Sequence, residues 1–301
     1  MSTASRSPLR MALPLIAVLA LLALWTLYWF IASGIVQANV ADERAKLVEG
    51  GKILTCAHEA WGGYPFRFEV TCDRPKLELE NGLAVQSVKL QALAQAYDPG
   101  HIIALLDGPT TLNIPSQPAV AISHDPVIGS YVASQAKGDI ATVEFRNVVA
   151  APFGTLTRAV VSLRKRSDDL QDFALDATGL TMTTGLNQTL AVDSLTVDAT
   201  LADQTTFTLN SAKAIAGKLK ATAQGSIMRD ANNRPEGTVA ITLSDPAEAA
   251  LIAAQSFKLT PEQQSALTAA LTLMGGKANL VAKDGQLSLG PLPIATLPPL
   301  N

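Results

Sequence analysis

The sequence predicts a mainly β (α+β) fold, with an N-terminal transmembrane helix, an elongated antiparallel β-sheet ectodomain and two short helices near the C-terminus. Three observations predict it. No charged residue occurs from Met11 to Ala41. Most of the following chain alternates apolar and polar residues with the period of two that is typical of half-buried strands. Turn-forming pairs such as Asn81-Gly82 separate these runs.

The N-terminal apolar stretch is long enough to cross a bilayer, which takes about 20 apolar residues. Arg6 and Arg10 precede it and Asp42 and Glu43 follow it. The positive-inside rule therefore predicts a cytoplasmic N-terminus and an ectodomain outside the cytoplasm. A cleaved signal peptide is the alternative, although the stretch exceeds the apolar region of about 7–15 residues expected of signals. The predicted segments are a cytoplasmic N-terminus (1–12), an anchor (13–36), a juxtamembrane helix or linker (37–51) and a β-rich periplasmic domain (52–301).

Composition supports a folded ectodomain and argues against nucleic acid as a partner. The chain is 48% hydrophobic and 16% charged, which is typical of a globular core rather than of disorder. The net charge is −3, and Arg6 and Arg10 contribute +2 of it, which leaves −5 after the apolar stretch. A mildly acidic domain lacks the clustered Lys and Arg that phosphate contacts need. The domain folds as one unit or as two subdomains that divide near 125–140.

The strands follow one another as an antiparallel meander. Two helices interrupt it near the C-terminus, and each begins with a cap and a proline, at Asp245-Pro246 and Thr260-Pro261. The second has Leu267 and Leu271 on one apolar stripe, so we expect the pair to pack on the apolar face of the sheet. A proline-rich extended tail closes the chain. The expected strands are 52–59 (paired with 66–72), 66–72, 76–80, 83–94, 101–106, 110–114, 119–123, 142–149, 159–163, 173–177, 190–201, 205–209, 218–227, 238–243, 278–282 and 286–289.

Cys56 and Cys72 are the only cysteines. A disulfide between them suits a compartment outside the cytoplasm, and a zinc site would need four ligands. Two buried free thiols are the alternative.

Aromatic side chains gather between the two cysteines. They form a candidate docking surface, and the core of the N-terminal sheet is the alternative role for the same side chains. The residues of this candidate docking surface are Trp61, Tyr64, Phe66, Arg67 and Phe68.

The chain carries no recognisable catalytic motif: it lacks the nucleophile elbow, the phosphate-binding loop, the dinucleotide fingerprint and the zinc-protease motif. His124 and Asp125 are adjacent, and adjacent strand residues point to opposite faces, so we expect a turn at Ser123-His124-Asp125-Pro126. We therefore predict a protein that is not an enzyme, with no catalytic, cofactor or metal site.

Two segments carry a resemblance to a known family. The run Gly62–Cys72 with the upstream Cys56, and the closing run Gly285–Pro293, resemble an uncharacterised bacterial envelope family, domain of unknown function 2125. The resemblance implies an inner-membrane-anchored protein of Gram-negative bacteria with no assigned catalytic residues. The architecture is more distantly similar to AsmA-like envelope proteins, which are linked to lipid traffic and outer-membrane assembly.

These observations lead to one functional expectation and one alternative. A curved sheet with only two covering helices leaves part of its apolar face as a groove, which suits an apolar ligand such as lipid, or a role in envelope assembly. The alternative is a structural or interaction module for another envelope protein, with no ligand groove. The expected partners are the inner-membrane bilayer and a lipid or an envelope protein.

Overall fold

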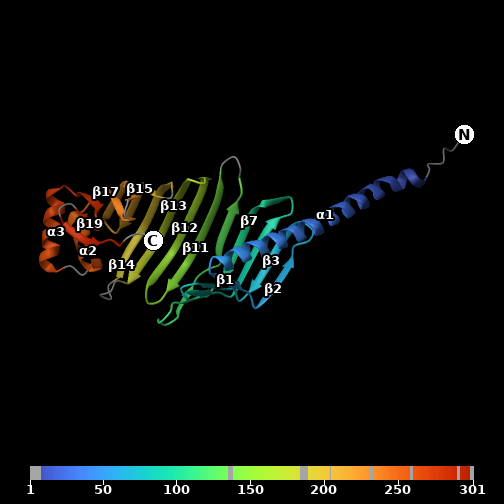
Figure 1. Cartoon of the computed structure of the whole chain (residues 1–301), viewed down its shortest axis with the longest axis horizontal. Coiled ribbons are helices and arrows are strands. Elements are labelled where there is room, and N and C mark those ends of the chain that lie inside the picture. Colours follow the sequence, from blue (N-terminus) through green and yellow to red (C-terminus); the bar gives the residue numbers. More distant parts are fainter. Residues whose placement is uncertain are drawn as a thin grey trace.

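The computed structural model describes residues 8–134, 138–183, 189–203, 205–230, 233–257, 260–289 and 292–298. It confirms the mainly β fold with one long apolar N-terminal helix and two short C-terminal helices. The molecule is elongated: α1 (Pro8–Glu49) projects from one end, while α2 (Pro246–Phe257) and α3 (Pro261–Leu273) lie at the other (Figure 1). The strands between them run across the long axis.

All twenty strands in the described ranges belong to one antiparallel sheet. From β10 to β19 each strand pairs with the next strand along the chain. The strands are β1 (Lys52–Thr55), β2 (His58–Gly62), β3 (Arg67–Asp73), β4 (Lys76–Leu79), β5 (Ala84–Gln86), β6 (Lys89–Gln95), β7 (Asp98–Asp107), β8 (Thr110–Asn113), β9 (Val120–Ser123), β10 (Val127–Val132), β11 (Asp139–Ala150), β12 (Gly154–Ser167), β13 (Leu170–Thr183), β14 (Thr189–Ala202), β15 (Thr206–Ala216), β16 (Leu219–Arg229), β17 (Pro235–Leu243), β18 (Lys277–Lys283), β19 (Gln286–Leu289) and β20 (Leu292–Thr296).

Five strand runs bend along one line, which we call the crease. Strands β1, β3, β5, β7 and β9 continue across it into β2, β4, β6, β8 and β10. One branch of the sheet, β10–β7–β6–β3–β2, lies on one side, and the branch β9–β8–β5–β4–β1 lies on the other. Ser87 and Thr110 are buried along the crease and share a hydrogen bond of 2.9 Å.

The crease explains why the expected strand 52–59 was wrong as a single element. It divides into β1, which pairs with β4, and β2, which pairs with β3. The run 83–94 divides into β5 and β6 in the same way. Sequence reasoning also missed two strands: β10, which contains Gly129 and follows Pro126, and β20 in the expected tail. Because β20 pairs with β19 alone among the described strands, Pro293 is tolerated there as it is on any sheet edge.

Helices α2 and α3 pack on the apolar face of the sheet, as predicted, at the end formed by β17 and β18. Leu267 and Leu271 of α3 form a buried cluster with Ala250 of α2 and Ala278 of β18. The predicted capping box is present: the Gln263 backbone N–H donates to Thr260 Oγ1 (3.2 Å), and the Thr260 N–H donates to Gln263 Oε1 (2.9 Å). Local sequence signals thus determine where α3 begins.

Candidate functional site

The central sheet carries one continuous apolar face. Residues directly opposite each other in paired strands point to the same face, so the pairing register shows which side chains lie together. We call three neighbouring rows that cross β11 to β18 the apolar face. The middle row is Val143, Val161, Leu175, Val197, Ala212, Ala223, Ile241 and Ala278. The flanking rows are Phe145, Ala159, Ala177, Leu195, Ala214, Ala221 and Leu243, and Ala141, Leu163, Phe173, Ala199, Leu209, Gly225, Val239 and Leu280.

The opposite face of the same strands is polar. Its central row is Glu144, Val160, Asp176, Thr196, Lys213, Thr222, Thr242 and Lys277. Arg146 and Arg158 both reach Glu144, with Nε to Oε1 distances of 2.9 and 2.7 Å. Hydrogen bonds from these two guanidinium groups hold the pKa of Glu144 below its ordinary value. This face is therefore the solvated side of the sheet.

The apolar face is covered at its two ends. The C-terminal helices pack against Ala278 and Leu243 at one end. At the other, the middle row continues through Gly129, Ala104 and Ala92 to Val70, beside Phe68 on β3. Helix α1 packs there through Trp29, because Trp29, Phe68 and Ala96 form one buried cluster.

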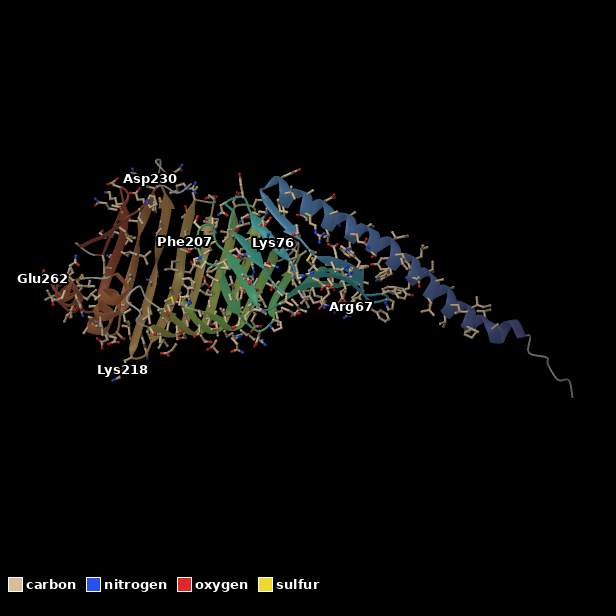
Figure 2. The ribbon with its side chains drawn as sticks, turned by 90° about the horizontal axis from the view of Figure 1, so that it is seen from below. Arg67, Lys76, Phe207, Lys218, Asp230 and Glu262 are labelled. Atoms are coloured by element: carbon tan, nitrogen blue, oxygen red, sulfur yellow. A yellow bond between two sulfur atoms is a disulfide. The ribbon has the colours of Figure 1, made fainter. Side chains whose placement is uncertain are left out.

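Between these ends the apolar face lies open. Leu163 is 47% exposed and Phe207, which extends the face beside Leu201 and Ile227, is 39% exposed. Figure 2 shows Phe207 on the sheet between the C-terminal helices and α1. The alanines of β15 and β16 leave a shallow depression of about 230 Å³, bordered by Leu195 and Ile241. No described helix covers this part of the sheet (Figure 1).

The junction between α1 and the sheet is built from hydrogen bonds as well as apolar contacts. Trp25 Nε1 donates to the carbonyl oxygen of Pro65 at 2.9 Å, and Trp29 Nε1 donates to that of Arg67 at 3.0 Å. The Tyr28 hydroxyl donates to the Ala96 carbonyl at 2.7 Å. Three successive aromatic side chains of α1 therefore satisfy backbone acceptors at the end of the sheet.

The loop that receives α1 has a local cause in the sequence. Gly63 has φ of +98°, and a Cβ there would collide with the carbonyl oxygen of Arg67. The Arg67 N–H closes the loop by donating to the Gly63 carbonyl at 3.0 Å. Glycine is therefore required for this turn, which presents Tyr64 and Phe66 beside the helix.

The candidate docking surface lies largely at this junction. The Phe68 ring is 5.9 Å from Trp29, and Phe66 is 6.4 Å from Trp25. The Tyr64 ring is 5.3 Å from Trp29, and its hydroxyl shares a 2.8 Å hydrogen bond with Thr26 Oγ1. The side chains of the other two residues have polar partners: Arg67 pairs with Glu69 (3.0 Å), and Trp61 Nε1 donates to Glu59 Oε1 (2.8 Å).

Sequence reasoning missed the helix side of this junction. Trp25, Tyr28 and Trp29 lie in the apolar stretch that predicts the anchor, yet Trp29 is only 7% exposed because it packs against Phe68 and Ala96. The spacing i, i+3, i+4 of these aromatic residues, which places them on one helix face, was the signal that could have found it.

A disulfide joins Cys56 to Cys72, with a Cα–Cα distance of 5.3 Å. It ties the segment between β1 and β2 to β3, the strand that also carries Phe68. The disulfide thus stabilises the group of strands on which α1 packs. An ion pair of 2.6 Å between Arg44 and Glu59 joins the later part of α1 to β2.

His124 is bound into the crease. Its Nε2 lies 2.8 Å from Thr110 Oγ1 and its Nδ1 lies 2.7 Å from the carbonyl oxygen of its neighbour Asp125. Both ring nitrogens thus have partners, and Thr110 is buried. The contact between His124 and Thr110 therefore links the bend between β9 and β10 to the start of β8.

The fold, the apolar face and the junction with α1 define a class of protein. It is an elongated β-sheet with one apolar face, joined at one end to a helix that is long and apolar enough to cross a membrane. The chain belongs to the family described as uncharacterized protein conserved in bacteria, DUF2125, whose model matches residues 29–298. The match begins at Trp29 and so includes part of the helix side of the junction. Comparisons with curated proteins and with solved structures gave no match.

Proposed function

We propose that this protein is a non-enzymatic, membrane-anchored lipid-binding protein whose open apolar face holds acyl chains. In this proposal the N-terminus lies in the cytoplasm and the sheet lies on the periplasmic side of a bacterial inner membrane. Arg6 and Arg10 before the apolar helix support this orientation. The Cys56–Cys72 disulfide supports an oxidising compartment.

The observation that carries the proposal is the open apolar face itself. Its rows cross the strands, so they run along the long axis of the molecule (Figure 1). The open part of these rows runs from β11 to β16, because α2 and α3 pack against Leu243 of β17 and Ala278 of β18. Five steps between neighbouring strands separate β11 from β16, and at about 4.8 Å per step they span about 24 Å. That length exceeds about 15 Å, which is half of the hydrocarbon thickness of a bilayer and the share of one leaflet. An acyl chain laid along the rows would therefore contact the apolar face along its whole length.

The chemistry of the face favours lipid over a polar ligand. The rows contain aliphatic and aromatic side chains, together with one glycine, and no charged residue. Contact with acyl chains would remove this apolar surface from water at about 25 cal/mol per Å². The small alanine side chains of the depression leave room for a flexible acyl chain and do not select one lipid head group. The face also begins next to α1, which brings it close to a bilayer as the source of lipid.

Lipid mass spectrometry on the full-length protein, purified in mild detergent, tests this proposal. Leu163→Glu and Phe207→Glu place a charge on the apolar face at exposed positions, so the fold is retained. Thr196→Glu places the same charge on the opposite face of β14 and serves as the matched control. We expect phospholipid to co-purify with the wild type and the control, and to be depleted in both apolar-face variants.

Two results would count against lipid binding. One is a wild type that retains no more lipid than a single-helix membrane protein of unrelated ectodomain. The other is equal retention in the wild type and Phe207→Glu. Recovery of one stoichiometric envelope protein on this face, without lipid, would favour the interaction module instead.

A further inference from the structure

We propose that the ectodomain touches the bilayer directly, through an aromatic tip made of Tyr64, Phe66 and Tyr97 that rests in the membrane interface beside α1. The partner is the lipid surface on the ectodomain side of the membrane. This inference uses α1 as a membrane-crossing helix, but it does not depend on lipid binding by the apolar face.

The tip residues are unusually exposed for aromatic side chains. Phe66 is 65% exposed, Tyr97 68% and Tyr64 53%. They are held together by the loop: the Ala96 N–H, next to Tyr97, donates to the Phe66 carbonyl at 2.8 Å. Leu27, Phe30 and Ile31 of α1 are also exposed. Contiguous exposed apolar side chains mark an interaction site, and tyrosine suits the boundary between hydrocarbon and water.

The height of the tip above the cytoplasmic end of α1 identifies the partner. Arg10 is the last charged residue before the apolar stretch. At 1.5 Å per residue, Trp25 lies about 22 Å and Trp29 about 28 Å beyond Arg10 along the helix axis. The hydrocarbon core is about 30 Å thick. Since Trp25 and Trp29 are hydrogen-bonded to the carbonyl oxygens of Pro65 and Arg67, the loop reaches α1 before the helix has left the core or its interface.

Changes in the position of the helix do not remove this contact. A tilted helix gains less height per residue, which brings the tip closer to the membrane centre. Lifting the tip clear would draw the charged Arg10 into the hydrocarbon, which is unfavourable. The polar backbone of Gly62 and Gly63 resists deep burial in lipid. The balance places the tip in the interface, within the roughly 40–45 Å that a bilayer spans with its head groups.

Photo-cross-linking of the full-length protein in vesicles tests the contact. The vesicles contain phosphatidylcholine and phosphatidylglycerol, and a benzoyl-phenylalanine replaces Phe66 or Tyr97. The matched control carries the same group at Phe153, which is 56% exposed in the turn between β11 and β12. After illumination we expect a mass increase of one phospholipid at positions 66 and 97, and none above background at 153.

Equal lipid adducts at positions 66, 97 and 153, or none at 66 and 97, would overturn the proposal. Position 97 provides a second reading if the probe at 66 disturbs folding, and an intact Cys56–Cys72 disulfide reports that the loop is formed. Failure here is separate from failure of the lipid-binding proposal, because the latter is read from co-purified lipid in detergent and from Phe207→Glu.

Discussion

Replacing Trp29 by alanine is the sharpest test of how α1 is joined to the sheet. Trp29 is 7% exposed, packs against Phe68 and Ala96, and donates a hydrogen bond to Arg67. Burying an aromatic side chain removes about 200 Å² from water, and at about 25 cal/mol per Å² this amounts to about 5 kcal/mol. Because that figure is an upper bound, we expect Trp29→Ala to lower the free energy of unfolding by about 3–5 kcal/mol.

The assay is denaturant unfolding in mild detergent, followed by the circular dichroism of the sheet. Leu27→Ala is the control, because Leu27 lies on the same helix and is 58% exposed; we expect a change within about 0.5 kcal/mol. Trp29→Phe keeps most of the ring but removes the donor to Arg67, and we expect a loss of about 1–3 kcal/mol. The reasoning is refuted if Trp29→Ala is no more destabilising than Leu27→Ala.

Three further predictions concern the rest of the ectodomain. Leu271→Ala, which leaves a cavity in the buried cluster under α3, should lower the free energy of unfolding by about 2–5 kcal/mol. Leu273→Ala, at an exposed position, should change it little. Equal melting temperatures of the two variants would contradict the packing of α3. Replacing Cys56 and Cys72 by serine should cost about 3 kcal/mol in chemical denaturation, from the loop that the disulfide closes, and unchanged stability would contradict this. The pKa of Glu144 is lowered in the folded state, so its contribution to the free energy of unfolding is present above the ordinary pKa of 4.5 and is lost as the pH falls below that value. Melting temperatures measured across that range should depend less on pH in Glu144→Gln. An unchanged acid slope would argue against the Arg146 and Arg158 contacts.

Elements that depend on a few consecutive residues were predicted correctly, and elements that depend on pairing with distant strands were not. The hairpin at Asn81-Gly82 and the capping box at Thr260 were predicted, because each depends on a few consecutive residues. Strand β10 was missed, because Gly129 and Ser130 weaken its propensity and only pairing with β7 and β11 stabilises it. The strand 52–59 was wrong because its two halves pair on opposite sides of the crease, which no local signal specifies.

The sequence by itself determined an apolar helix long enough to span a membrane and an antiparallel sheet with one apolar and one polar face. Both follow from short-range composition and periodicity. The sequence left two interpretations of Cys56 and Cys72 open, and the fold brought their Cα atoms within 5.3 Å. Only the tertiary structure decided that the apolar residues of eight strands align into continuous rows, since register depends on partners far apart in the chain. It also decided that Trp29 packs against protein, because that requires the loop at Gly63 to meet the helix at the correct height.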